Sequence, residues 1–152
     1  MTDVLRVMLV DDHALVRSAV RAALEAPDIE VVAEASTAEA AVEEAVRTRP
    51  DVLLLDVDMP GMTGIQLVRE LRPRLPETQI VMLSASGDDR TVVEAMRQGA
   101  AGYLTKDLGP EALQRAVRGV RSGDLAMSRN MAARASSMTW AAQKSYSVFE
   151  VR

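Results

Sequence analysis

The chain contains no cysteine, which excludes disulfide bonds and metal sites built on cysteine. It has no apolar run close to the roughly 20 residues that a membrane-spanning helix needs. The N-terminus lacks the basic segment followed by an apolar stretch that marks a signal peptide. Together these absences favour a cytoplasmic protein without a membrane partner.

Positive charge is not in excess, since the formal net charge is −4. Non-specific binding to nucleic acid is therefore not expected. Hydrophobic residues make up 48% of the chain and charged residues 26%, a balance typical of a globular domain with a buried core. A length of 152 residues favours one domain with a short appendage.

Strand-like apolar runs begin near residues 5, 29, 51, 79 and 101, and helical patterns occupy the segments between them. Alternation at this spacing indicates βα units and a parallel sheet. Right-handed crossovers then favour an α/β, flavodoxin-like, doubly wound sheet of five strands with five helices. The strand order 2-1-3-4-5 is taken from known folds of this kind, whose ligands bind where the order reverses, between strands 1 and 3.

Two helix starts carry a capping box, in which Ser or Thr is followed three residues later by Glu or Gln. Ser36 with Glu39 predicts the start of the second helix, and Thr63 with Gln66 predicts the start of the third.

The C-terminal segment differs from the rest of the chain. Residues 127–137 could form one more short helix with a thin apolar face, and most of the few aromatic residues follow it. We expect a domain over residues 1–122 and a linker-like helix and tail over residues 123–152. The tail could anchor a partner or could be a terminus without fixed structure.

Polar residues of different chemical kinds follow four of the apolar runs. They are Asp11 and Asp12, then Asp56, then Ser84, and finally Thr105 and Lys106. Because the carboxyl ends of parallel strands share one edge of a sheet, three acids, a hydroxyl and an ammonium would converge there. Such a set suits Mg²⁺ together with a phosphoryl group, since Mg²⁺ prefers carboxylate and phosphate oxygens.

Each of these residues also has a simpler interpretation. Asp11 and Asp12 could cap the first helix, where acids are common, and Lys106 could be a solvated surface lysine. Asp56 could be a turn residue at the end of its strand, and Ser84 an ordinary loop hydroxyl. In the functional interpretation Asp56 is a nucleophile that forms an acyl phosphate, while Lys106 and the Ser84 hydroxyl neutralise and bind the phosphoryl oxygens. The joint placement favours the phosphoryl site. His13, the only histidine, is interpreted as an early helix residue without a role in it.

Four segments carry this pattern: Val10–Arg17, Asp56–Gly64, Ser84–Ala85 and Gly102–Asp107. In this order and spacing they resemble the receiver domain of two-component response regulators, over roughly residues 4–122. The Asp-Asp-His opening and the Gly-Tyr-Leu-Thr-Lys-Asp ending resemble the NarL/FixJ (LuxR-type) branch.

The resemblance implies that a histidine kinase donates a phosphoryl group to the chain with Mg²⁺ present, and that the domain switches conformation to control dimerisation and transcription. It implies contact between protomers through helices 1 and 5, or through the helix 4 to helix 5 face. The implied site residues are Asp56 as phosphoacceptor, Ser84 as switch hydroxyl, Tyr103 as switch aromatic, Lys106 as phosphate-binding lysine, and Asp11, Asp12, Asp56 and the backbone carbonyl of Asp58 as metal ligands. A domain of this kind is a signalling phosphoacceptor that catalyses only its own phosphorylation and dephosphorylation.

Two departures from the family pattern stand out. Asp107 follows the lysine where many receivers have proline, and a cis bond there would cost about 3–4 kcal/mol more than a trans bond. Receivers of this branch usually continue into a helix-turn-helix domain, which residues 123–152 do not resemble. Direct DNA binding by this chain alone is therefore not expected.

Two other functions remain open. A receiver fold could serve as an interaction module without being phosphorylated. Asp56-Val57-Asp58 also fits the nucleophile and acid of a haloacid-dehalogenase-like phosphohydrolase, although that family places the pair after its first strand and would leave Asp11 and Asp12 unused.

Overall fold

The computed structural model describes residues 3–59, 61–85, 89–128 and 148–151. Its strands are β1 Leu5–Val10, β2 Ile29–Ala35, β3 Val52–Asp56, β4 Gln79–Ser84, β5 Gly102–Thr105, β6 Leu125–Ser128 and β7 Val148–Val151. Its helices are α1 Ala14–Ala23, α2 Ala38–Thr48, α3 Gly64–Leu71, α4 Asp89–Arg97 and α5 Pro110–Arg121. None of these helices is long and apolar enough to cross a membrane.

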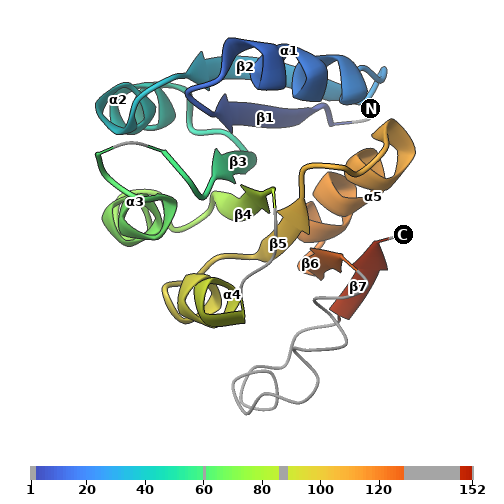
Figure 1. Cartoon of the computed structure of the whole chain (residues 1–152). Helices are drawn as coiled ribbons and strands as arrows, with labels where there is room; N and C mark the ends of the chain where they lie inside the picture. The colour runs from blue at the N-terminus through green and yellow to red at the C-terminus, as the bar shows by residue number, and fades with distance from the viewer. Residues whose placement is uncertain (1–2, 60, 86–88, 129–147, 152) are drawn as a thin grey trace.

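The strands form one sheet in the order β2-β1-β3-β4-β5-β6-β7 (Figure 1). Every neighbouring pair is parallel. The predicted α/β class and the order 2-1-3-4-5 are thus confirmed for the first five strands. In the C-terminal extension two further strands, β6 and β7, continue the sheet beyond β5.

The β6 strand replaces the beginning of the helix that we expected over residues 127–137. Leu125 and Met127 are buried on one face of the sheet and Ala126 on the other, an alternation with the period of a strand. Ala126 pairs with Gly102 and Met127 with Tyr103, so β6 satisfies backbone groups that an edge strand would leave open. Residues 129–137 of the expected helix lie outside the described residues.

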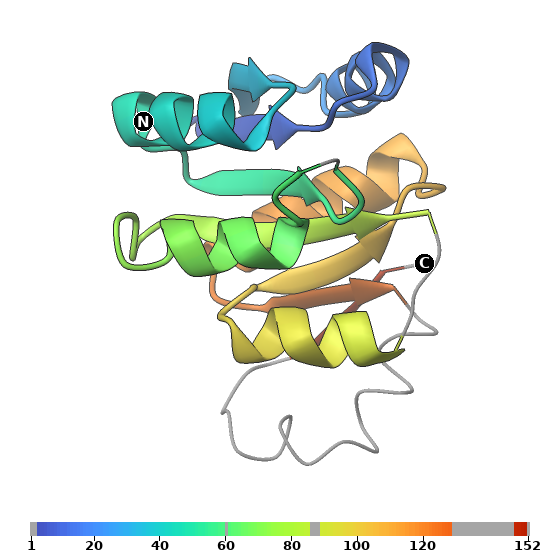
Figure 2. The same ribbon diagram turned by 60° about the vertical axis from the view of Figure 1, so that its left-hand side comes forward.

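Helices cover both faces of the sheet. Figures 1 and 2 show α2, α3 and α4 on one side and α1 and α5 on the other. Alternate residues of the central strands divide accordingly, with Leu53 and Leu55 packed under the first group and Val52 and Leu54 under the second. Because both faces are buried, the β3 run reads as continuously apolar until Asp56.

Capping fixes where α2 and α3 begin. The Thr37 hydroxyl accepts a hydrogen bond from the Ala40 backbone at 3.1 Å, so the predicted cap at Ser36 was wrong by one residue. The capping box predicted at Thr63 and Gln66 is confirmed, with hydrogen bonds of 2.8 and 3.2 Å. The Gly64 amide donates to the Val57 carbonyl at 3.2 Å, so α3 starts beside the end of β3.

Candidate functional site

The predicted site residues other than Tyr103 lie at the carboxyl edge of the sheet, and strand register brings the central ones together. Val10 pairs with Leu55, which places the next residues, Asp11 and Asp56, beside each other. The ladder continues past β5, where the Lys106 amide donates to the Ser84 carbonyl at 2.8 Å. The chain thus delivers acids from β1 and β3 and the lysine from β5 to one place.

A single ammonium group bridges the two most buried acids. Lys106 Nζ lies 3.1 Å from Asp56 Oδ1 and 3.2 Å from Asp11 Oδ2. Both carboxylates are buried, and the Asp56 residue is only 1% exposed. Each is also oriented by the backbone amide two residues later, from Asp58 at 3.0 Å for Asp56 and from His13 at 2.9 Å for Asp11.

Burial raises the pKa of Asp56 above its ordinary value, and the nearby charge of Asp11 adds to this effect. Hydrogen bonds from the Asp58 amide and from Lys106 oppose it without cancelling it. For Lys106, burial alone would lower the pKa, but the hydrogen bonds and charges of Asp56 and Asp11 outweigh burial and raise it. Lys106 is therefore a permanent cation at neutral pH.

One oxygen of Asp56 remains available. Among the described residues, the buried Oδ2 atom of Asp56 has no hydrogen-bond partner, while Oδ1 is held by Lys106 and the Asp58 amide. Ligand atoms of Asp11, Asp12, His13 and Asp56 lie within 4.8 Å of one another. Three carboxylates against one ammonium leave negative charge in excess, and hard oxygen donors of this kind fit a divalent cation such as Mg²⁺.

The remaining predicted residues lie around this cluster. Ser84 is buried at the end of β4, next to β3, and pairs with Thr105 of β5. Tyr103 is buried on the face covered by α2, α3 and α4, where its cluster also includes Met127 of β6. The Asp58 side chain is exposed. The described chain contains no cis peptide bond, so Lys106-Asp107 is trans.

The contact of His13 with the two acids was not predicted from the sequence. It occupies the N-cap of α1 without a capping hydrogen bond from its side chain. Its Nδ1 atom instead lies 3.1 Å from an oxygen of Asp11 and 3.1 Å from an oxygen of Asp12. The only available signal was its position directly after the two acids.

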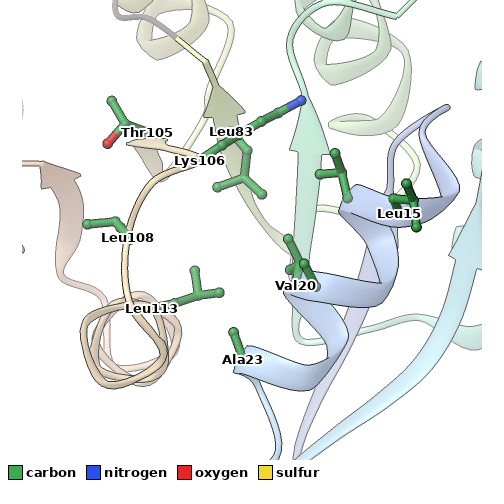
Figure 3. A pocket seen from close by; sticks show the side chains of 10 residues that line it. Leu15, Val20, Ala23, Leu83, Thr105, Lys106, Leu108 and Leu113 are labelled. Carbon is green, nitrogen blue, oxygen red and sulfur yellow. The ribbon is translucent and has the colours of Figure 1, made fainter.

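An apolar groove of about 310 Å³ runs between α1 and α5 and reaches Lys106 (Figure 3). In Figure 3 the side chains of Leu15 and Val20 line one wall, Leu108 and Leu113 lie across from them, and the Lys106 nitrogen points away from the apolar lining. No residue of α1 is fully buried, and Leu15 is 87% exposed. The apolar face of α1 is therefore only partly covered by its own chain.

The family model of the response regulator receiver domain matches residues 7–118. The nitrate/nitrite response regulator protein NarL of Escherichia coli (strain K12) is 41% identical over 123 residues, which are 80% of this chain and 57% of NarL. An uncharacterised transcriptional regulatory protein of Bacillus subtilis (strain 168), YxjL, is 38% identical over 143 residues, 93% of this chain and 66% of YxjL.

Solved structures of response regulators have the same fold. The signal receiver domain of the putative response regulator NarL from Mycobacterium tuberculosis has a TM-score of 0.75 and 39% identity, covering 80% of this chain and 98% of that one. A LuxR-family two-component response regulator from Aurantimonas sp. SI85-9A1 has a TM-score of 0.82 and 34% identity, covering 86% and 94%. This chain spans less than two thirds of the length of the curated relatives given above.

Proposed function

Because the chain belongs to the response regulator receiver family of two-component signalling, we propose that Asp56 is its phosphoacceptor and that Lys106 and the acid pair assemble the phosphoryl site around it. The observation that carries this proposal is the asymmetry of the Asp56 carboxylate. Its Oδ1 atom is held by Lys106 and the Asp58 amide, whereas the buried Oδ2 has no partner among the described residues. Oδ2 is therefore the nucleophilic oxygen.

The donor is the phosphohistidine of a histidine kinase. Asp56 Oδ2 attacks phosphorus as the bond from phosphorus to the imidazole nitrogen breaks, and the departing imidazole keeps that electron pair. Lys106 holds Asp56 in position and neutralises negative charge that grows on the phosphoryl oxygens. Dephosphorylation is attack by water on the same phosphorus, so the domain catalyses only its own modification.

Mg²⁺ is the proposed cofactor, with Asp11, Asp12, Asp56 and the backbone carbonyl of Asp58 as its ligands from the chain. When bound, the ion supplies positive charge and fixes the phosphoryl oxygens for in-line attack. Hydrogen bonds from the backbone amides of His13 and Asp58 fix the orientation of the Asp11 and Asp56 carboxylates. The ligand atoms of Asp11, Asp12 and Asp56 lie within 4.8 Å of one another, and this concentration of carboxylates supports the assignment.

Ser84 and Tyr103 are the proposed switch. The Ser84 hydroxyl donates a hydrogen bond to the phosphoryl group, which draws the end of β4 toward Asp56. Ser84 pairs with Thr105 of β5, and Tyr103, two residues before Thr105 on the same strand, adjusts to this movement of β4. Phosphorylation then changes the populations of two packed states. Support comes from the burial of both side chains and from the position of Ser84 at the sheet edge that holds Asp56.

Incubation with acetyl phosphate and Mg²⁺ tests the proposal. We expect the intact mass to rise by one phosphoryl group, and we expect no rise for Asp56→Ala or when EDTA removes the metal. A wild-type chain that gains no mass under any condition would reduce the protein to an interaction module with a receiver fold. Turnover of a free phosphomonoester would instead favour the phosphohydrolase alternative, which the position of Asp56 at the end of the third strand disfavours.

We place the homodimer contact on the groove between α1 and α5, rather than on the helix 4 to helix 5 face. The apolar lining and the exposed Leu15 support this choice, and β6 already pairs along the outer edge of β5. The histidine kinase and a second copy of the chain are the proposed partners. Direct DNA contact is not proposed, because a net charge of −4 disfavours binding to a polyanion. The cytoplasm is the proposed location.

Leu15→Glu tests the dimer contact. A charge in the apolar groove should weaken self-association by about tenfold or more, as loss of a central interface residue does. Sedimentation equilibrium with beryllofluoride and Mg²⁺ measures it. Ser18→Glu adds the same charge to α1 outside the residues that line the groove and should leave the dimer intact. If both variants self-associate equally well, the dimer contact does not lie on this groove.

A further inference from the structure

His13 contacts Asp11 and Asp12 although most of its side chain is exposed to solvent. The side chain is 62% exposed, yet Nδ1 lies 3.1 Å from Asp11 Oδ1 and 3.1 Å from Asp12 Oδ1. It does not cap α1, the usual task of a side chain at this position. The ring is therefore directed at the site rather than at the helix that begins beside it.

The spacing of these three atoms matches neighbouring ligands of one ion. Octahedral ligands about 2.1 Å from a small divalent ion are about 3 Å from their neighbours. The distances from the imidazole nitrogen to both carboxylate oxygens have this value. The ligand atoms of Asp11, Asp12, His13 and Asp56 all fall within 4.8 Å, so the imidazole occupies the edge of the same cluster.

A second observation, independent of the imidazole, also points to a ligand at this place. Asp56 is 1% exposed, and its Oδ2 atom has no hydrogen-bond partner among the described residues. A buried carboxylate oxygen without a partner is costly unless a cation or donor reaches it. Lys106 contacts the other oxygen of Asp56, which leaves Oδ2 open to the cluster.

We propose that His13 is a ligand side chain of this metal site and that its nitrogen shifts the preference of the site from Mg²⁺ toward divalent first-row transition ions. The inference rests on the metal site of the proposed function and adds a residue to it. Mg²⁺ favours a shell of oxygens, whereas imidazole nitrogen is a good ligand for transition ions. Without the nitrogen, the site presents carboxylate and carbonyl oxygens that serve Mg²⁺ well.

A competing role for the ring is purely local. In the tautomer with a proton on Nδ1, the ring would donate to Asp11, at the 3.1 Å separation observed, and would not contact an ion. The two roles differ in one measurable property, which is the distance of the imidazole nitrogen from a bound paramagnetic ion. A ligand nitrogen couples directly to the electron spin, and a ring that only donates to a carboxylate does not.

The experiment uses Mn²⁺ as the probe and the untagged full chain. Because the chain has one histidine, labelling histidine with ¹⁵N marks His13 alone. We expect the pulsed electron paramagnetic resonance spectrum of bound Mn²⁺ to contain nitrogen coupling that changes with the label and disappears in His13→Asn. Asn is a favoured N-cap residue, so this variant should retain α1.

Affinity gives the second readout. His13→Asn should weaken Ni²⁺ binding by about tenfold and change Mg²⁺ binding by less than about twofold, since imidazole nitrogen is a good ligand for Ni²⁺ and a poor one for Mg²⁺. A Mn²⁺ spectrum that does not change with the ¹⁵N label would overturn the inference about His13. The proposed function would still hold in that case if the chain is phosphorylated with Mg²⁺. If the wild-type chain binds neither Mg²⁺ nor a transition ion, both the inference and the metal site of the proposed function are overturned.

Discussion

Lys106→Met should lower the free energy of unfolding by about 3 kcal/mol in the absence of divalent metal. Removing one partner of a buried ion pair leaves an uncompensated charge, which costs more than an intact pair contributes. Here the loss is shared by two carboxylates, because Lys106 Nζ lies 3.1 Å from Asp56 and 3.2 Å from Asp11. Urea unfolding in EDTA measures the effect.

Two controls separate this effect from general loss of charge. Arg74→Met removes a cation from an exposed pair with Glu70, at 2.9 Å, and should cost less than about 1 kcal/mol. Adding Asp56→Asn to Lys106→Met should recover part of the lost stability, because it removes one of the stranded charges. Equal losses for Lys106→Met and Arg74→Met would contradict the arrangement of the cluster.

Gly102→Ala should detach β6 from the sheet and cost about 3 kcal/mol or more, in the range of substitutions that force a backbone to move. A Cβ atom at residue 102 would lie 2.4 Å from the carbonyl oxygen of Ala126. The Ala126 amide, which donates to the Ala101 carbonyl at 3.1 Å, would then lose its protection from hydrogen exchange. Exchange measured by mass spectrometry over residues 124–128 reports the change directly.

Gly109→Ala is the matched control, because a Cβ atom at that residue would meet nothing within 4 Å. It should leave exchange at β6 unchanged. Since Tyr103 pairs with Met127 and shares its cluster, Gly102→Ala should also increase the exposure of the Tyr103 ring. Protection at Ala126 that survives the substitution would contradict the role of β6 as a continuation of the sheet.

The sequence predicted the structure correctly where a strand could be recognised from its residues and a polar residue stood at its end. The uninterrupted apolar run of β3 predicted a strand buried on both faces, and such strands belong to parallel sheets. The edge of a parallel sheet then required Asp11, Asp56 and Lys106 to meet, and they do so within 3.2 Å. Chain topology, rather than local propensity, made these predictions accurate.

Prediction failed where neighbours outside the local sequence decide the structure. Residues 125–128 are too few for periodicity to distinguish a strand from a helix, and pairing with β5 settles the matter. Ser36 and Thr37 are adjacent capping residues, and the start of α2 at Ala38 selects the second. The direction of the His13 ring depends on two carboxylates whose orientation no pattern in the sequence expresses.

We expect the phosphoryl group to reside on Asp56. Borohydride reduces an aspartyl phosphate to homoserine, so treating the acetyl phosphate reaction with borohydride and sequencing its peptides by mass spectrometry locates the modified residue. The proposed site predicts homoserine at position 56 in the presence of Mg²⁺ and unmodified aspartate there when EDTA is present. Homoserine at Asp11, Asp12 or Asp58 with Asp56 intact would contradict it.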